Sequence, residues 1–168
     1  MSEKGPHADA RLLKHHEDYI GSHMAFIDWT PKLSVGSPLM DRQHKALIAL
    51  INQLHSAMLK GALKEDMQKV FSELIWYTAS HFNSEEALMR ETGYPRLASH
   101  YLEHVEFVRK AQDLHAQLLA GKFTVSIDLL RFLKSWLSDH ILGSDQQYAP
   151  YLKVEKSPVA HGCEPSRV

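Results

Sequence analysis

The strongest constraint on how this chain folds is a set of five histidines and two carboxylates that continue the apolar faces of four expected helices. Polar side chains are costly to bury unless each finds a partner, so a set of this size on faces that should form a core needs a common explanation. Its members are His44, His81, Glu85, His100, His104, His140 and Asp145. We interpret them as the ligands of a metal site that holds two ions.

The bulk composition excludes several classes of protein. The chain has 168 residues, enough for one domain with a hydrophobic core, and its formal net charge of −1 leaves no basic excess for binding nucleic acid. No apolar run is long enough to insert into a membrane, and the N-terminal residues lack the apolar stretch of a secretory signal. The single cysteine, Cys163, suits a reducing compartment. We therefore expect a cytoplasmic protein whose metal ligands are nitrogen and oxygen rather than thiolate.

Two helices are expected in the first half of the chain. Apolar residues recur at helical spacing over residues 39–60, and again over residues 64–91. Gly61 follows the first of these segments and Gly93 follows the second. Glycine just past a periodic segment is typical of a helix C-terminus, so both boundaries are predicted at these glycines.

Two further helices are expected in the second half. The third should begin near Pro95, a favourable first-turn residue, and close at Gly121. The fourth should begin near Thr124, a plausible N-cap, and end around Gly143. No segment has the pattern of a strand. The fold class predicted from these features is all-α.

The connections between these helices are short, which indicates antiparallel neighbours in an up-down-up-down four-helix bundle. The polar residues of the candidate site lie near the start of the first and third helices and near the end of the second and fourth. In an antiparallel bundle these positions fall at the same end. Helical periodicity alone does not require this agreement, so it supports a shared site.

Two pairs in the set have the spacing that a helix needs to bind one metal centre. Residues four apart lie on one face of a helix, about 6 Å from each other. His81 with Glu85 and His100 with His104 have this spacing. Both pairs can therefore converge on a metal without any change in the regular helix.

The pair His140 and Asp145 is the exception, because its members are five residues apart. On a regular helix that places them about 140° out of line. The backbone must therefore bulge, unwind or end between them, and Gly143 makes such a change inexpensive. A π-type turn, which often occurs at functional sites, would bring the two side chains together.

The donor set also narrows the metal and its chemistry. Two carboxylates can bridge two ions, and five imidazoles can fill most of the remaining positions. Imidazole and carboxylate suit iron, manganese, zinc or copper, and iron or manganese is the usual occupant of carboxylate-bridged pairs in helical bundles. Those sites are rich in glutamate, whereas this donor set has five histidines and two carboxylates, so it carries less negative charge than they do. We infer that it is better suited to holding dioxygen reversibly than to cleaving it.

These motifs resemble those of the hemerythrin family, in particular its bacterial single-domain members. The resemblance covers about residues 25–152 and includes every ligand position in order. The matching pieces are Trp29; Asp41-Arg42-Gln43-His44; His81-Phe82-Asn83-Ser84-Glu85-Glu86; Tyr94-Pro95 followed by His100 and His104; and Trp136-Leu137-Ser138-Asp139-His140-Ile141 followed by Asp145.

The resemblance implies a non-haem centre of two iron ions in an antiparallel four-helix bundle. One iron would be held by His100, His104 and His140, and the other by His44 and His81. The two carboxylates of the set would bridge the ions, together with an oxo or hydroxo group. The iron with two histidines would keep an open position for dioxygen.

An apolar oxygen pocket is also implied by the resemblance. Its counterparts here would be Leu47, Phe82, Trp136, Leu137 and Ile141. Such a pocket slows oxidation of the irons, because it keeps protons and anions away from them.

The rest of the chain divides into terminal segments around this domain. We expect residues 1–23 to be an extension that is loose or forms a short helix around residues 11–20, residues 24–152 to be the hemerythrin-like domain, and residues 153–168 to be a flexible tail. The tripeptide His15-His16-Glu17 is expected on a solvated surface, because adjacent helical residues point to different faces and chelate poorly.

Three further polar residues are expected to play no part in the site. His55 and His115 each lie eleven residues past a ligand, which is about 16 Å along a helix; we expect them to form a buried or rim polar pair. Glu86 points away from the apolar face and is expected to be exposed.

Several functions are compatible with this centre. The favoured hypothesis is reversible dioxygen binding for transport, storage or delivery to an oxygen-consuming enzyme, without catalysis by the protein itself. The alternative is a sensor of oxygen, redox state or nitric oxide that uses the same centre. A di-iron peroxidase or oxidase is disfavoured by the shortage of carboxylates, and a metal store would need more weak carboxylate sites.

Overall fold

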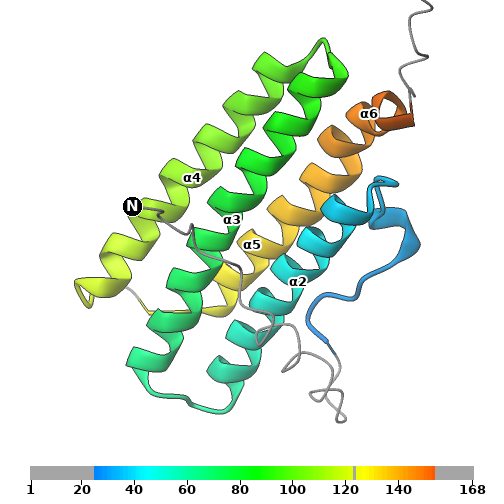
Figure 1. Ribbon diagram of the computed structural model, residues 1–168. Coiled ribbons are helices and arrows are strands. Elements are labelled where there is room, and N and C mark those ends of the chain that lie inside the picture. Colours follow the sequence, from blue (N-terminus) through cyan, green and yellow to red (C-terminus); the bar gives the residue numbers. More distant parts are fainter. Residues whose placement is uncertain (1–24, 123, 154–168) are drawn as a thin grey trace, which may run out of the picture.

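The computed structural model describes residues 25–122 and 124–153. Its main body is a bundle of four long helices (Figure 1): α2 (Pro38–Leu59), α3 (Lys64–Thr92), α4 (Leu97–Leu119) and α5 (Ile127–His140). A 3₁₀ turn, η1 (Pro31–Leu33), precedes them, and η2 (Ile141–Asp145), α6 (Gln146–Tyr148) and η3 (Ala149–Lys153) follow. Over the described ranges there is no strand. The predicted all-α four-helix bundle is confirmed.

The starts of two helices differ from the prediction. Thr124 does not cap α5; Ser126 does, because its hydroxyl accepts a hydrogen bond from the Leu129 N–H at 3.3 Å. Both residue types cap helices well, so the sequence alone did not distinguish Thr124 from Ser126, and the helix begins two residues later than predicted. Pro95 lies in the turn before α4 rather than in its first turn, and the helix begins at Leu97.

The ends of α2, α3 and α4 follow the predicted glycines, whereas α5 ends at His140 and the helical backbone continues past Gly143 as η2 and α6. Gly93 closes α3 in the left-handed conformation, with φ of 70°. Its N–H reaches the Arg90 carbonyl at 3.2 Å, and the Tyr94 N–H reaches the Met89 carbonyl at 2.9 Å. This pattern satisfies carbonyls that the helix end would otherwise leave unpaired, and glycine adopts it without strain.

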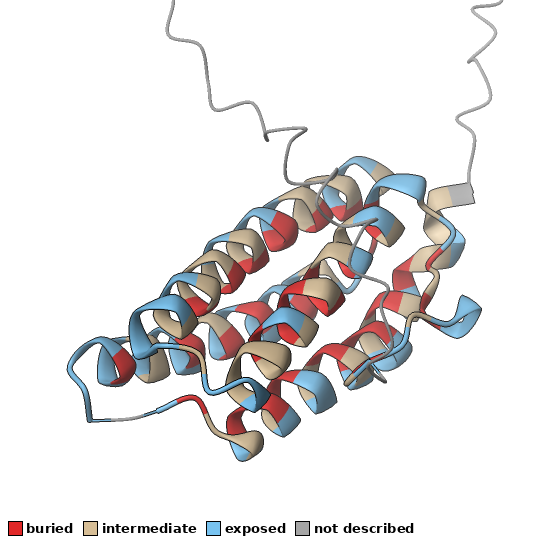
Figure 2. Cartoon of the chain, turned by 90° about the horizontal axis from the view of Figure 1, so that it is seen from below, coloured by how far each residue is buried: buried red, intermediate tan, exposed pale blue. Residues whose placement is uncertain are grey.

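The core lies between the helices, which turn their buried faces inward (Figure 2). α2 packs on α3 and on α5, and α3 packs on α4. The buried apolar residues come from every long helix and from the segment before α2, which contributes Ile27, Leu33 and Val35. That segment is fastened to α2 by Asn52, whose side-chain amide exchanges two hydrogen bonds of 2.9 Å with the backbone of Ile27.

Some predictions concern parts of the chain that the structure does not describe. The N-terminal extension (residues 1–23), the tripeptide His15-His16-Glu17 and almost all of the predicted tail lie outside the described residues. Among the helices that are described, none is long and apolar enough to cross a membrane.

Candidate metal centre

The candidate site lies at the end of the bundle where α2 begins, α3 turns into α4 and α5 ends (upper right in Figure 1). Each of its seven predicted residues is at most 5 % exposed. Apart from these seven and the tyrosines Tyr94 and Tyr148, Thr78 is the only buried residue with a polar side chain in the part of the chain that the structure describes. The fold therefore concentrates nearly all of its buried polar groups in one place.

Four of the residues form one group around a carboxylate. Glu85 Oε2 lies 3.3 Å from His100 Nε2 and 3.1 Å from His104 Nε2. His104 Nε2 in turn lies 3.0 Å from His140 Nε2. The ligand atoms of this group all lie within 4.8 Å of one another, so one metal ion could contact them all after small movements.

A second group shares the same carboxylate. His44, His81 and Glu85 also bring their ligand atoms within 4.8 Å of one another. The two imidazoles meet edge to face, with ring centroids 4.8 Å apart. Glu85 belongs to both groups, which places it between two potential metal positions.

Asp145 lies close to histidines of both groups. Its Oδ1 lies 3.2 Å from His140 Nε2 and 3.5 Å from His100 Nε2, and its Oδ2 lies 3.4 Å from His44 Nε2. None of these contacts has the geometry of a hydrogen bond. Both Asp145 oxygens and both His44 nitrogens have no hydrogen-bond partner among the described residues.

These four orphaned atoms provide a physical test of whether the residues fit metal ions. Leaving one buried polar group unsatisfied costs about 1–3 kcal/mol, and native proteins rarely tolerate such groups without a reason. The Asp145 oxygens lie 3.2–3.5 Å from three imidazole nitrogens, but none of these contacts has the geometry of a hydrogen bond. Nitrogen and oxygen donors directed at a common centre in this way fit divalent metal ions.

The backbone between His140 and Asp145 forms the turn that aligns them. α5 ends at His140, and residues 141–145 continue as a π-helix. The extra residue in this turn compensates for the five-residue spacing, so the prediction of a local departure from regular helix is confirmed. Gly143 itself is in a helical conformation with no positive φ, and an added Cβ would meet nothing within 4 Å. The expected advantage of glycine at this position is therefore not used.

Burial sets the protonation states of the site. It lowers the pKa of His81 and that of His140 to about 3. Burial opposes ionisation of Glu85 as well, but the close contacts of its Oε2 with the His100 and His104 imidazoles outweigh burial and hold the Glu85 pKa well below its ordinary value. Burial and the charge of Glu85 raise the pKa of Asp145 well above its ordinary value. Since the two lowered imidazoles are neutral at pH 7, they are in the form that binds metal ions.

Three imidazoles are held from behind by residues that sequence reasoning did not include in the site. In each pair the ring Nδ1 donates a hydrogen bond to a side-chain oxygen, which leaves Nε2 facing the centre. The pairs are His81 with Gln43, His104 with Glu86 and His140 with Glu103, at 2.9, 2.9 and 3.0 Å. The prediction that Glu86 is exposed is wrong: its side chain is 12 % exposed because it turns toward His104 on the neighbouring helix.

The sequence positions of these supporting residues could have identified them, but only if it were known which helices are neighbours in the bundle. Gln43, Glu86 and Glu103 each directly adjoin a predicted ligand in the sequence, which places them about 100° around the helix from it. From there each reaches an imidazole on another helix, a contact that periodicity along a single helix cannot reveal. A fourth residue, Tyr148, donates a hydrogen bond of 2.6 Å to Glu85 Oε1.

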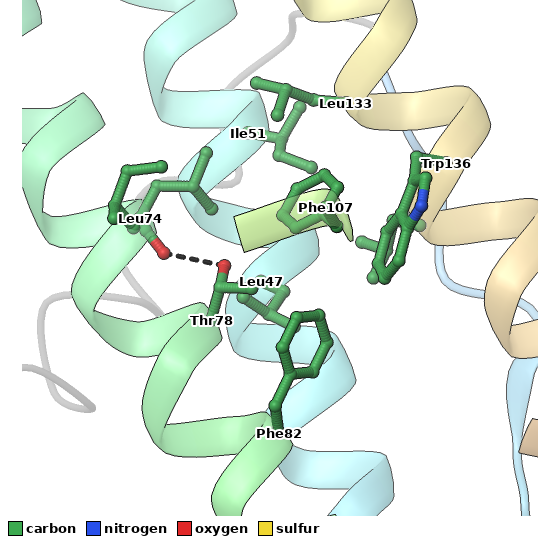
Figure 3. Close-up of a pocket in the computed structure, with 10 residues that line it drawn as sticks. Leu47, Ile51, Leu74, Thr78, Phe82, Phe107, Leu133 and Trp136 are labelled. Carbon is green, nitrogen blue, oxygen red and sulfur yellow. Dashed lines mark hydrogen bonds between the residues drawn. The ribbon is translucent and has the colours of Figure 1, made fainter. Parts of the chain in front are cut away.

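A small apolar cavity, whose lining is drawn in Figure 3, reaches the centre through Phe82 and Trp136. Its volume is about 20 Å³, and the predicted pocket residues Leu47, Phe82, Trp136 and Leu137 are among those that line it. Phe82 stacks on the ring of His104 at a centroid distance of 3.7 Å, and Trp136 stacks on that of His140 at 4.4 Å. Ile141, the fifth predicted pocket residue, is buried but is not part of this lining.

The cavity is poorly suited to water. A buried water needs two to four polar partners. Thr78 supplies the only side-chain polar group of the lining that faces the other residues in Figure 3, and its hydroxyl already donates to the Leu74 carbonyl at 2.7 Å. A small apolar molecule loses nothing in such a space, whereas water would lose hydrogen bonds.

His55 and His115, predicted to form a polar pair outside the site, have separate partners instead. His55 stacks on Phe26 at a centroid distance of 4.5 Å. His115 lies 2.7 Å from the Ser72 hydroxyl through its Nε2 and meets the ring of Phe71 edge to face. Neither belongs to a group of side chains that could hold a metal within the described residues.

Comparisons with known proteins agree with this geometry. The family described as "Hemerythrin HHE cation binding domain" matches residues 35–152. A protein named bacteriohemerythrin from Stenotrophomonas maltophilia is 36 % identical over 140 residues, which cover 82 % of this chain and 88 % of that protein. Another of the same name from Methylococcus capsulatus is 35 % identical over 132 residues, covering 78 % of this chain and all of that protein.

Solved structures give the same result. A crystal structure of wild-type hemerythrin superposes with a TM-score of 0.73 at 34 % sequence identity, and the match covers 76 % of this chain and 98 % of that one.

Proposed function

This chain belongs to the hemerythrin family, whose domains bind oxygen at a di-iron centre, and on that premise we propose that it binds dioxygen reversibly for transport, storage or delivery. The observation that carries the proposal is the set of orphaned donor atoms of His44 and Asp145, in a centre whose His104 and His140 rings stack on two residues that line an apolar cavity. The recipient of delivered oxygen in this proposal is an oxygen-consuming enzyme, and we place the process in the cytoplasm.

The two metal groups indicate how iron would be held. When bound, a pair of iron ions with an oxo or hydroxo bridge supplies the two electrons that reversible binding of dioxygen requires. The residues that would hold the ions are His100, His104 and His140 at one position, His44 and His81 at the other, and Glu85 and Asp145 between them.

The side chains around the centre favour holding oxygen over reducing it further. Cleavage of dioxygen needs protons, and proton transfer needs a donor within hydrogen-bond reach. Thr78 is committed to the Leu74 carbonyl, and the other side chains that line the cavity are hydrocarbon or aromatic. Trp136 and Phe82 close the cavity against the imidazoles of His140 and His104. These walls keep water and acids away from the site.

The decisive experiment is a visible spectrum recorded during an oxygen cycle. The protein is loaded with iron, reduced without air, exposed to air and then flushed with argon. We expect about two irons per chain, a new absorption band in air, and loss of the band under argon over several cycles. Stoichiometric iron with no reversible band would contradict the proposal. Rapid conversion to a stable oxidised form would favour the sensor, and turnover of peroxide with a reductant would favour an enzyme.

A further inference from the structure

The supporting residues differ in charge between the two metal groups. In the group of His100, His104 and His140, two imidazoles donate from Nδ1 to carboxylates, those of Glu86 and Glu103. In the group of His44 and His81, the corresponding acceptor is the neutral amide of Gln43. The two positions therefore differ in the side chains that accept hydrogen bonds from their rings as well as in their number of histidines.

Glu103 carries a second contact that links it to the π-turn. Its Oε2 accepts a hydrogen bond from the Ser144 hydroxyl at 2.6 Å, in addition to the one from His140 Nδ1 at 3.0 Å. Glu103 lies on α4, whereas Ser144 lies within η2. One carboxylate oxygen on a neighbouring helix therefore fixes both the ring of His140 and the turn that presents Asp145.

The surroundings of the two carboxylates are also unequal. The Glu103 side chain is 46 % exposed and lines a groove between α4 and α5 together with Glu106 and Asp139. Glu86 is 12 % exposed.

Both carboxylates nevertheless have the same effect on their imidazoles. Because a hydrogen bond to a carboxylate fixes the tautomer of an imidazole and raises its basicity as a ligand, Glu86 and Glu103 make their rings stronger metal donors than an amide acceptor would.

We propose that Glu86 and Glu103 are positioning residues that make the two metal positions unequal: the position of His100, His104 and His140 binds iron more tightly and favours its oxidised state more than the position of His44 and His81. This inference rests on the proposed di-iron function. The two positions are unequal because carboxylates accept hydrogen bonds from the imidazole Nδ1 atoms at one of them, as well as because the numbers of histidines differ. The position of His44 and His81 thus keeps the weaker donors.

The test compares isosteric charge changes in the full-length protein. Glu103→Gln and Glu86→Gln keep an oxygen acceptor but remove the charge, and Gln43→Glu adds a charge at the other position. Glu106→Gln is the control, because Glu106 lines the same groove without a hydrogen bond to any imidazole in the described structure. Iron affinity is measured by competition with a chelator, and reduction potentials by titration.

We expect Glu103→Gln and Glu86→Gln each to weaken the tighter iron-binding step by about 10- to 100-fold, the usual effect of removing a residue that supports a ligand. Their potentials should rise, that of Gln43→Glu should fall, and the control should match the wild type. A merely structural role would not move the potential in opposite directions. Equal affinities and potentials in Glu103→Gln and the control would overturn the proposal.

A measurement without metal separates this inference from the proposed function. In the iron-free protein, nitrogen NMR should show the His140 proton on Nδ1, protected from exchange, and Glu103→Ala should abolish that protection. A wild-type chain that binds no iron would disprove the proposed function, and the NMR result would still decide whether Glu103 orients His140. An Nδ1 proton that exchanges freely in the wild type would overturn the positioning role.

Discussion

The two ends of the bundle use the same four helices for opposite purposes. At the end away from the site, the core is hydrocarbon and aromatic: Leu54, Phe71, Leu118 and Leu130 are each at most 1 % exposed. At the site end, helix faces with equal burial carry imidazoles and carboxylates. The comparison indicates that the far end stabilises the fold. The buried polar groups of the site end destabilise the metal-free protein, and bound metal ions would offset this cost.

The largest expected effect is at the far end. Phe71 is fully buried, and replacing such a residue by alanine costs about 3–5 kcal/mol through lost burial and the cavity left behind. Phe71→Ala should therefore lower the free energy of unfolding by this amount, measured in denaturant, while about two irons per chain still bind once the protein is folded. A loss of iron from the folded variant would show that the two ends are coupled rather than separate.

Removal of metal should act on the site end. A ligand that binds only the folded state stabilises it by about 2.7 kcal/mol at a concentration one hundred times its dissociation constant. Thermal unfolding with and without bound iron should differ by an amount of this order, and Phe71→Ala should show the same difference. Chelation that leaves the melting temperature unchanged would mean that the orphaned atoms of the site carry no energetic cost.

Lowering the pH should destabilise the iron-free protein through the histidines at the site end of the bundle. The pKa of His81 and that of His140 are lowered to about 3 in the folded state, whereas an unfolded histidine titrates near 6.5. The unfolded chain therefore binds more protons between these values, and stability falls as the pH drops through this window. At pH 5.5 the loss is about 1.4 kcal/mol for each histidine. The raised pKa of Asp145 offsets part of it.

The measurement is the free energy of unfolding of the iron-free chain between pH 7.5 and 5.5. Replacing both histidines by glutamine should flatten the slope, whereas Phe71→Ala should shift the curve without changing its slope. A wild-type slope that survives the double replacement would place the acid-sensitive groups elsewhere in the chain.

What the sequence predicted and what it missed also divide along helix boundaries. The fold class, the helix ends at Gly93 and the π-turn between His140 and Asp145 follow from periodicity and spacing, which are properties of one helix at a time. The supporting contacts of Glu86 and Glu103 cross from helix to helix. They depend on how neighbouring helices are rotated and shifted, which no single helical pattern contains.

The smallest effect concerns Gly143 and tests what produces the π-turn. Glycine destabilises a helix by about 0.5–1 kcal/mol relative to alanine. Because Gly143 is exposed, has no positive φ and leaves room for a Cβ, Gly143→Ala should stabilise the protein slightly and leave the iron content unchanged. The turn is then maintained by the contacts of Ser144 with Glu103 and of Asp145 with the centre rather than by glycine. A fall in iron content in Gly143→Ala, with no such fall in Ser144→Ala, would show instead that the glycine maintains the turn.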